Sequence, residues 1–298
     1  MNILHLTSAR IPGGSERDLR ELARAQGATV ITPSAAAMAE FFGPMHGGSL
    51  RMGGMLDVFS PIRLSKRLDA LVGDTLVHTW DVRAAAIALS ARRLVRAPER
   101  VRVILSFPAE TAETRRLKGL DRLVTDSLVH PGYPDYSLPR VTPEDGVFRI
   151  IRFGEITHRS RLQELIRALE PLLELPGWRL EVCGTGKSRE VMPAVRLARG
   201  LGVDARIDWL GDDADVDERL ARASLAVFPG ECGERDKVRA MYAGVPVITG
   251  LDTAEIRRYI EDPAMTERDG AGARARTLRD YDFKAYCSAL RALYGTLY

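Results

Sequence analysis

Short apolar runs alternate with amphipathic stretches along the chain, and this alternation predicts the fold class. The strands expected in the first half are Ile3–Thr7, Thr29–Thr32, Thr75–His78, Val101–Phe107 and Arg122–Val129. The stretches Glu16–Gln26, Pro61–Leu71 and Val82–Val95 carry apolar side chains at helical spacing. Residues 35–57 are rich in Gly, Ala and Met, and we expect a loop region with one short helix there. Strands that alternate with helices are typical of a parallel sheet between helical layers.

The alternation starts again in the second half. Strands are expected at Phe148–Phe153, Leu180–Cys183, Ile207–Leu210, Leu225–Phe228 and Val245–Ile248. Helices are expected at Arg161–Leu173, from about Lys187 to Gly200, at Val216–Ala223, at Lys237–Ala243 and over the tail Asp280–Tyr298. Residues 131–146 have the Pro, Gly and polar composition of an interdomain linker. We therefore predict two doubly wound α/β domains, residues 1–140 and residues 147–280.

Composition narrows the setting of the protein. A chain of 298 residues with 45% hydrophobic residues can bury a sizeable core. Its three cysteines are far apart and have no C-x-x-C spacing, which favours a reduced cytoplasm over a disulfide framework or a zinc site. No charged segment precedes the first strand, and no apolar run approaches the roughly 18 residues of a membrane span. We expect a protein that is neither exported nor membrane-spanning.

Charge is unevenly distributed along the chain. The net charge of +3 is small and does not suggest a nucleic-acid partner. However, Arg83–Arg122 holds ten basic and four acidic residues, a local charge of +6. This region is either a solvated basic face or a surface for anionic lipid head groups at the inner face of the membrane.

Two glycine-rich turns follow predicted strands and open helices. Gly13 and Gly14 would let backbone approach a ligand and leave helix N–H groups available to an anion, although G-x-G-x-x-G is absent. Gly184 and Gly186 precede Lys187, but Glu181 occupies the first glycine position of a phosphate-loop motif. A turn that touches a nucleotide base or phosphate is therefore favoured over an NTPase site.

The stretch from Leu225 to Gly250 predicts a strand, a polar loop, a helix and a second strand. Ligands of open α/β sheets bind outside the carboxyl ends of strands, so residues 231–237 are expected to line a crevice. Glu231 could accept hydrogen bonds from sugar hydroxyls. Four cations could converge on a diphosphate, although each alone is typical of a surface charge: Arg159, Arg161, Lys237 and Arg239.

His78 ends a predicted strand on the same side of the first sheet, where it is either a structural or a catalytic histidine. The sequence has no nucleophile-elbow motif, no H-E-x-x-H and no Asp-rich cluster, so no metal ligands are predicted.

These features resemble the retaining nucleotide-sugar glycosyltransferases with the GT-B fold, over nearly the whole chain. The opening strand with Gly13-Gly14-Ser15-Glu16-Arg17 is similar to the family's glycine loop, and Leu76-Val77-His78-Thr79-Trp80 resembles its "VHxH" strand. The most specific likeness runs from Trp209-Leu210-Gly211 through Phe228-Pro229 to Ala243-Gly244-Val245-Pro246-Val247-Ile248.

The resemblance implies two Rossmann-like domains facing a cleft, with the nucleotide-sugar donor on the second domain and a carbohydrate, lipid-linked or small-molecule acceptor on the first. It implies a closing helix, residues 281–298, that packs back towards the first domain, and catalysis without a cofactor or metal. Glu231 and His78 become the candidate catalytic residues. The diphosphate is expected at Arg159, Arg161 and Lys237, and the base near Gly184 and Gly186.

Three positions of the donor site differ from the family's motif, and Trp80 stands at the second histidine of its "VHxH" strand. Arg239 stands where a second glutamate would contact the ribose, and Glu155 and Ser160 stand where a phosphate-binding Arg and Lys are usual. Arg239 favours either a more anionic ligand or an internal ion pair, to Glu231, Glu234 or Glu155. Two functions remain open: a glycosyltransferase with an altered donor site in envelope, polysaccharide or natural-product glycosylation, or a catalytically degenerate GT-B subunit that supports an active protein partner.

Overall fold

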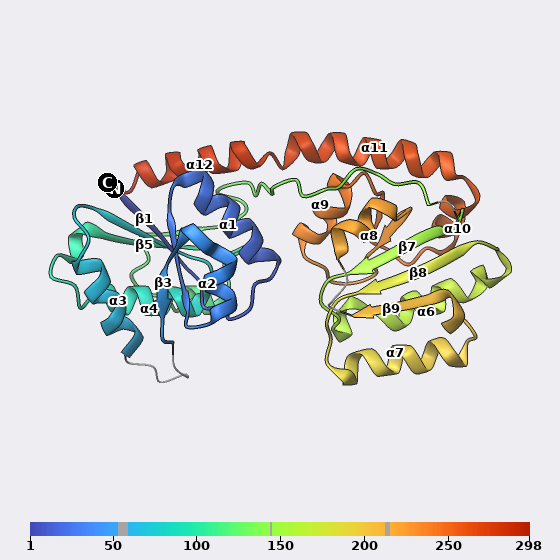
Figure 1. The fold of residues 1–298 in the computed structure, drawn as a ribbon, viewed down its shortest axis with the longest axis horizontal. Helices are drawn as coiled ribbons and strands as arrows, with labels where there is room; N and C mark the ends of the chain where they lie inside the picture. The colour runs from blue at the N-terminus through green and yellow to red at the C-terminus, as the bar shows by residue number, and fades with distance from the viewer. Residues whose placement is uncertain (53–58, 144, 212–214) are drawn as a thin grey trace. The chain divides into compact units, whose positions relative to one another are not determined.

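The computed structural model describes residues 1–52, 59–143, 145–211 and 215–298. They form two compact units, each with its own parallel sheet (Figure 1). Unit 1 combines residues 1–134 with residues 283–298, and unit 2 comprises residues 135–282.

The described part of unit 1 is a six-stranded parallel sheet with the order β3-β2-β1-β4-β5-β6. Its strands are β1 (Asn2–Leu6), β2 (Thr29–Pro33), β3 (His46–Leu50), β4 (Thr75–Thr79), β5 (Val101–Ser106) and β6 (Arg122–Val124). Its helices are α1 (Gly14–Gln26), α2 (Ala36–Phe42), α3 (Phe59–Asp69), α4 (Val82–Arg92), α5 (Ala112–Arg115) and α12 (Phe283–Gly295). The strand order reverses between β1 and β4, which makes this pair the switch point of a doubly wound sheet.

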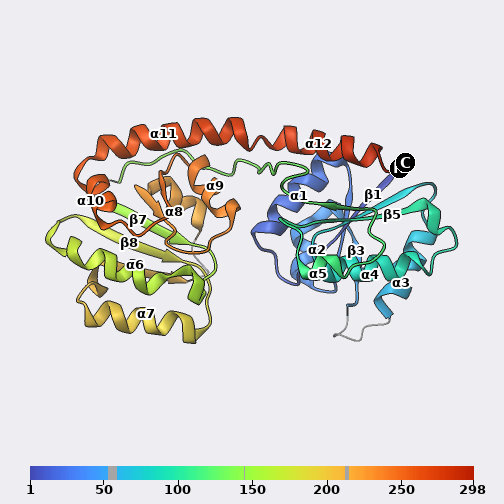
Figure 2. The ribbon, with the colours of Figure 1, turned by 180° about the vertical axis from the view of Figure 1, so that it is seen from behind.

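Alternating side chains of the unit 1 strands serve two different cores. Val77 of β4 packs with residues of α3 and α4, whereas its neighbour Leu76 packs with Leu290 and Tyr294 of α12. Both faces of the sheet are therefore covered by helices, as Figures 1 and 2 show. This is why every residue of β4 is buried, the polar ones included.

Unit 2 repeats the architecture with the order β11-β10-β7-β8-β9. Its strands are β7 (Phe148–Phe153), β8 (Trp178–Cys183), β9 (Ile207–Gly211), β10 (Leu225–Val227) and β11 (Val247–Ile248). Its helices are α6 (Leu162–Leu169), α7 (Ser188–Gly200), α8 (Val216–Arg222), α9 (Glu234–Tyr242), α10 (Thr253–Glu261) and α11 (Pro263–Asp280). The switch point of this sheet lies between β7 and β10.

The structure differs from the sequence-based expectation mainly in residues 35–57. They contain a strand, β3, with the sequence HGGSL, in addition to the short helix α2; residues 53–57 lie outside the described residues. The strand was missed because glycines disfavour strands, and β3 is an edge strand whose register to β2 is irregular between Val30 and Thr32.

Within the described ranges, no helix has both the length and the apolar character needed to cross a bilayer.

Candidate functional site

Three loops meet at the carboxyl edge of the unit 2 sheet. They follow β7 (residues 154–161), β8 (residues 184–187) and β10 (residues 228–233). The loops after β7 and β10 flank the switch point, the position at which doubly wound sheets bind ligands. The polar side chains of these loops form the candidate donor site.

Glycines allow the loops to approach each other closely. A Cβ atom on Gly184 would lie 2.1 Å from the carbonyl oxygen of Gly154, and Gly184 has a φ of 132° that L side chains rarely adopt. A Cβ atom on Gly230 would lie 2.0 Å from the carbonyl oxygen of Arg159. Gly186 forms a β-bridge with Ile156. The predicted glycine turn thus packs backbone against backbone within the site.

Arg152 supports the loop after β7 from inside the protein. Its side chain is 2% exposed, and its two terminal nitrogens donate to the carbonyl oxygens of Gly154 and Glu155, both at 2.6 Å. Burial lowers the pKa of this guanidinium, an effect partly opposed by Asp236. Its Nε has no hydrogen-bond partner among the described residues. A buried cation therefore lies directly beneath the loop.

Glu231 and Arg159 come together in this cluster. The backbone N–H of Glu231 donates to the carbonyl oxygen of Arg159 at 2.9 Å, and Arg159 Nη1 lies 3.3 Å from both carboxylate oxygens of Glu231. The two side chains are 69% and 62% exposed. An exposed ion pair of this kind contributes little stability, so a ligand can separate it at low cost.

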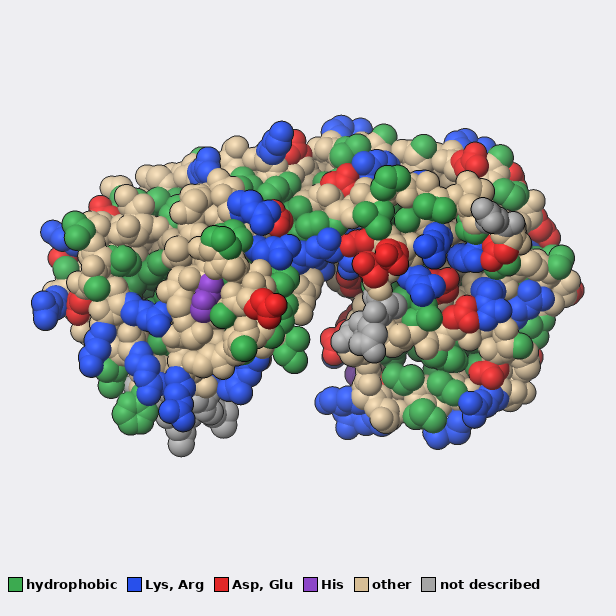
Figure 3. All heavy atoms as spheres, in the orientation of Figure 1, with side chains coloured by type: hydrophobic (Ala, Val, Ile, Leu, Met, Phe, Trp, Pro, Cys, Tyr) green, Lys and Arg blue, Asp and Glu red, His purple; other side chains and the backbone are tan. Residues whose placement is uncertain are grey.

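The other predicted diphosphate contacts are held by acidic neighbours. Arg161 pairs with Glu164 and donates to the carbonyl oxygen of Pro229 at 3.3 Å, with a left-handed backbone at φ 53°. Lys237 contacts Glu234 at 3.2 Å. Figure 3 shows basic and acidic side chains interleaved over the face of unit 2 in view.

Arg239 forms an internal ion pair, but with a partner that the sequence did not indicate. Its Nε lies 2.7 Å from Asp217 Oδ1, and the two side chains are 19% and 8% exposed. The predicted partners were Glu231, Glu234 and Glu155, and that prediction was wrong because Arg239 lies on the side of α9 that faces α8. Ser160, at the family's lysine position, is buried and donates to the carbonyl oxygen of Thr157 at 2.6 Å.

In unit 1, the glycine turn after β1 is closed by a carboxylate of the same chain. Gly13 is the N-cap of α1, and its N–H donates to Glu16 Oε2 at 3.1 Å. The Gly13 N–H, which the sequence suggested as a donor to a bound anion, is therefore already hydrogen-bonded to Glu16. Gly14 is the first residue of α1.

His78 is fully buried and belongs to a hydrogen-bonded network that spans unit 1. Its Nδ1 lies 2.7 Å from the hydroxyl of Tyr294, and its Nε2 lies 2.7 Å from the hydroxyl of Ser106. The ring stacks on Trp80 with 4.6 Å between centroids. The indole Nε1–H of Trp80 donates at 3.1 Å to Nδ1 of His5.

Gln26 joins the two ends of this network. Its Oε1 lies 2.9 Å from Nε2 of His5, and its Nε2 donates to the hydroxyl of Tyr294 at 3.3 Å. Burial lowers the pKa of His5 to about 4, and burial together with the charge of His5 lowers the pKa of His78 well below its usual value. Both imidazoles are therefore neutral at physiological pH.

Comparison with known proteins identifies the family to which this chain belongs. Residues 147–294, which include all three loops of the candidate donor site, match the model of the family "Glycosyl transferases group 1". This match places the chain among the group 1 glycosyltransferases. Solved structures agree with this fold: the Anabaena protein HepE in complex with UDP and glucose aligns with a TM-score of 0.79 at 16% identity, covering 99% of this chain and 100% of HepE.

Two further relatives of this group 1 glycosyltransferase resemble it over most of its length. The lipopolysaccharide outer core galactosyltransferase WaaB aligns with a TM-score of 0.69 at 13% identity, over 99% of this chain and 100% of WaaB. An exopolysaccharide phosphotransferase of Streptomyces coelicolor is 27% identical over 237 residues, 69% of this chain. The chain spans 24% of the length of that relative.

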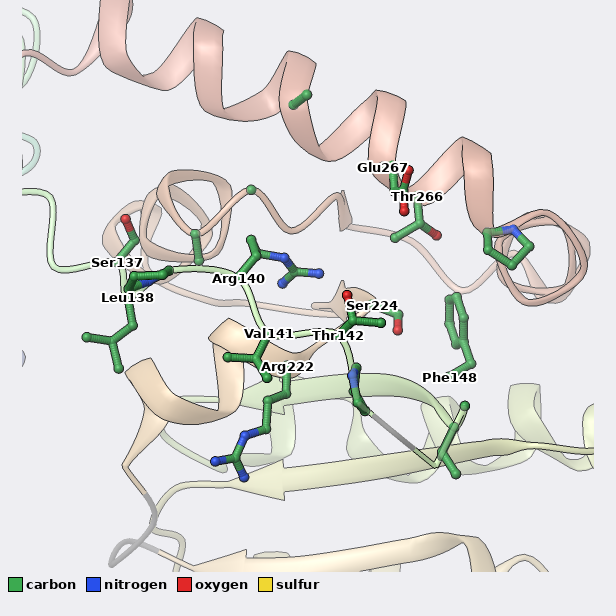
Figure 4. Close-up of a pocket in the computed structure, with 18 of the residues that line it drawn as sticks. Ser137, Leu138, Arg140, Val141, Thr142, Phe148, Arg222, Ser224, Thr266 and Glu267 are labelled. Atoms are coloured by element: carbon green, nitrogen blue, oxygen red, sulfur yellow. The ribbon is translucent and has the colours of Figure 1, made fainter.

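A cavity of about 1080 Å³ lies in unit 2 of this group 1 glycosyltransferase, away from the candidate donor site (Figure 4). Its lining includes Phe148 at the start of β7, Gly177 just before β8 and Ser224 just before β10, all at the amino ends of strands. Thr266 of α11 also lines it, and the buried Thr266 hydroxyl has no hydrogen-bond partner within the described part of the chain.

Sequence reasoning missed Arg152 and Ser106 in this group 1 glycosyltransferase. Arg152 interrupts an apolar strand. Because charged residues are rarely buried without a partner, its position in the predicted strand could have indicated that it holds a neighbouring loop. Ser106 carried no signal, because its partner His78 lies on a neighbouring strand. Among the described residues, no group of three or more His, Cys, Asp or Glu side chains is arranged to hold a metal.

Proposed function

We propose that this protein transfers a sugar from a nucleotide-diphosphate donor, in the first instance a UDP-sugar, to an envelope or polysaccharide acceptor. The observation that supports it is the coincidence of the family match with the loop cluster: residues 147–294 contain Glu231 and Arg159, which meet at the switch point of the unit 2 sheet. HepE, which has the same fold, is known in complexes with UDP and with UDP-glucose.

In this proposal, the donor sugar separates the exposed Glu231 carboxylate from Arg159, and the carboxylate then accepts hydrogen bonds from the sugar hydroxyls. Arg159, Arg161 and Lys237 then lie near the departing diphosphate, where cations stabilise the negative charge that develops. The backbone around Gly184 and Gly186 lies beside the base. Catalysis rests on positioning and on electrostatic stabilisation, with no metal and no protein nucleophile.

The acceptor belongs to unit 1 in this proposal. The names of WaaB and of the Streptomyces relative, which concern lipopolysaccharide and exopolysaccharide, favour a carbohydrate or lipid-linked acceptor. We place the protein in the cytoplasm, with Arg83–Arg122 in contact with anionic lipids. Sedimentation with phosphatidylglycerol vesicles should then fall steeply as salt rises, because exposed charges are screened within about 10 Å at 0.1 M salt. Salt-independent sedimentation or none would contradict the contact.

One observation favours a second function. Arg239, at the position where the family's second glutamate would contact the ribose, is turned away into an ion pair with Asp217. A site without that contact suits a degenerate GT-B subunit that supports an active glycosyltransferase.

A thermal-shift screen of nucleoside diphosphates and nucleotide sugars separates the two functions. A ligand at 100 times its dissociation constant stabilises the folded protein by about 2.7 kcal/mol, which is a measurable shift. A selective response to one diphosphate supports the transferase and names its donor class. If no member of the panel shifts the melting temperature while an intact family member responds in parallel, the result supports the degenerate subunit.

Replacing Glu231 with Ala tests the assigned role of this side chain. Turnover should be lost while the melting temperature stays within about 1 °C, because the ion pair with Arg159 is exposed. Glu261→Ala is the matched control, since the Glu261 side chain is 51% exposed and lies 3.4 Å from Arg257. Equal turnover in both variants would refute the assignment.

A further inference from the structure

The indole nitrogen of Trp80 decides which partner donates in each hydrogen bond of the buried network in unit 1; we call this the direction of the network. An indole nitrogen can donate a hydrogen bond but cannot accept one. Trp80 therefore donates to Nδ1 of His5, so this nitrogen carries no proton. A neutral His5 must then be protonated at Nε2 and donate to Gln26 Oε1, 2.9 Å away.

The direction continues through Gln26 to His78. Because Gln26 uses its oxygen towards His5, its amide nitrogen donates to the hydroxyl oxygen of Tyr294. The hydroxyl of Tyr294 has one proton, and among the described residues Nδ1 of His78 is the acceptor recorded for it, at 2.7 Å. His78 Nδ1 is thus an acceptor, and the proton of a neutral His78 lies on Nε2.

The last link reaches Ser106. His78 Nε2–H donates to the Ser106 hydroxyl oxygen at 2.7 Å. The Ser106 proton is then directed away from His78. No further hydrogen bond of this hydroxyl is recorded within the described residues, and Ser106 is half-buried at the carboxyl end of β5. That edge of a doubly wound sheet is where ligands bind.

We infer that Trp80 polarises this network so that Ser106 presents its hydroxyl proton as a fixed hydrogen-bond donor to an oxygen atom of the acceptor substrate. Ser106 is the acceptor-binding residue, and Trp80, His5, Gln26, Tyr294 and His78 are positioning residues. The inference rests on the proposed function for the identity of the ligand, but not for the direction of the network. It also gives His78 a role other than that of a base, because neither ring nitrogen is available to a substrate proton.

Near-neutral ¹⁵N NMR of the histidine rings tests the direction without any substrate. His5 and His78 should both appear as neutral rings protonated at Nε2. A His78 ring protonated at Nδ1 in the wild-type protein would overturn the inference.

Gln26→Glu reverses the network with almost no change in shape. A carboxylate only accepts, so the Tyr294 proton should turn to Glu at position 26 and His78 should become protonated at Nδ1. The Ser106 proton would then be directed towards His78 and lost to the ligand. Gln163→Glu, at an exposed position of α6 in unit 2, is the control and should leave both ring spectra unchanged. An unchanged His78 spectrum in folded Gln26→Glu would contradict the network.

Transfer assays test the role of Ser106. The probes are a UDP-sugar selected by thermal shift and a detergent extract of cell envelope as the acceptor source. Ser106→Ala and Gln26→Glu should each lower transfer at limiting acceptor about tenfold, while Ser106→Thr, which keeps a hydroxyl, should retain most of it. Donor-induced thermal stabilisation should be unchanged in all three variants.

The outcomes separate the inference from the function on which it rests. If the wild-type protein transfers sugar and Ser106→Ala does not reduce that transfer, the role of Ser106 is overturned and the proposed function stands. If the wild-type protein neither binds nor turns over a donor, the proposed function fails and the role of Ser106 fails with it. The ring spectra still decide the direction of the network in that case.

Discussion

Replacing Arg152 with Met should weaken both donor binding and the fold. The guanidinium is 2% exposed and donates to the carbonyl oxygens of Gly154 and Glu155, both at 2.6 Å. Hydrogen bonds from a charged group contribute about 1.5–3 kcal/mol each, so the variant loses about 3–6 kcal/mol of favourable interaction. It recovers the several kcal/mol that burial of the cation costs. We expect a net loss of about 1–2 kcal/mol and a fall in the melting temperature of a few degrees.

Donor binding is expected to weaken as well, because these two hydrogen bonds hold the loop that is proposed to contact the diphosphate. We expect at least a tenfold increase in the dissociation constant for UDP, which corresponds to about 1.4 kcal/mol. Isothermal titration calorimetry measures this constant, and circular dichroism measures the melting temperature. Arg152→Lys should lie between the wild type and Arg152→Met, because an ammonium group cannot reproduce the two-pronged geometry.

Arg149→Met is the matched control for Arg152→Met. Arg149 lies on the same strand near its amino end, where it contacts Asp145 and Glu181, and its side chain is 17% exposed. Its loss should lower the melting temperature without changing the UDP dissociation constant. If Arg152→Met binds UDP as tightly as the wild type, or if both variants weaken binding equally, the proposed support of the loop by Arg152 is refuted.

Three further predictions follow from other contacts. Thr266→Val should leave stability unchanged or raise it by about 1 kcal/mol, because the Thr266 hydroxyl is buried without a described partner. Thr277→Val should lower stability by about 1 kcal/mol, because the Thr277 hydroxyl donates to the carbonyl oxygen of Ala273 at 2.9 Å. Thermal melting compares the two, and equal effects would contradict the assignment of the orphaned hydroxyl. Gly184→Ala should be far more destabilising in urea unfolding than Gly177→Ala, since both have positive φ but only Gly184 faces an atom at 2.1 Å; similar losses would argue against the close loop contact. Because the His5 pKa is about 4 when folded and 6.5 as a free side chain, the unfolded chain binds more protons between these values, and stability should fall by about 3 kcal/mol as pH drops from 6.5 to 4. His5→Gln should lose that part of the slope, and an unchanged slope would contradict a neutral buried His5.

The order of strands and helices was largely predictable from the sequence, because buried parallel strands are short apolar runs and their helices are amphipathic. Unit 2 illustrates this: β7 was predicted with its observed bounds, Phe148–Phe153. The exceptions include β3, whose glycines carry no periodic signal, and the helices α10 and α11, for which no bounds were predicted. Edge strands bury little, so their sequences are weakly constrained.

The candidate site was predictable only in part. Parallel strands place their carboxyl ends at one edge, so the approach of the Arg159 and Glu231 loops follows from the fold class. The partner of Arg239 does not, because Asp217 lies 22 residues earlier on another helix. The network around His78 was also beyond sequence reasoning, since Tyr294 is 216 residues away from it.

Unit 1 is built from two separate pieces of chain, residues 1–134 and 283–298, whereas unit 2 is one continuous piece. Leu290 and Tyr294 from the second piece are fully buried, and Tyr294 closes the network that includes His78. A nascent chain can therefore complete unit 2 before unit 1, although unit 1 begins first. Until residues 283–298 have been synthesised, the face of the unit 1 sheet that carries Leu76 and Ile104 lacks its cover and presents apolar surface to chaperones. Unit 2 is thus inserted in sequence into unit 1, which can complete its fold only after its last helix has been synthesised. Premature termination near residue 282 should leave a folded unit 2 attached to an incomplete unit 1.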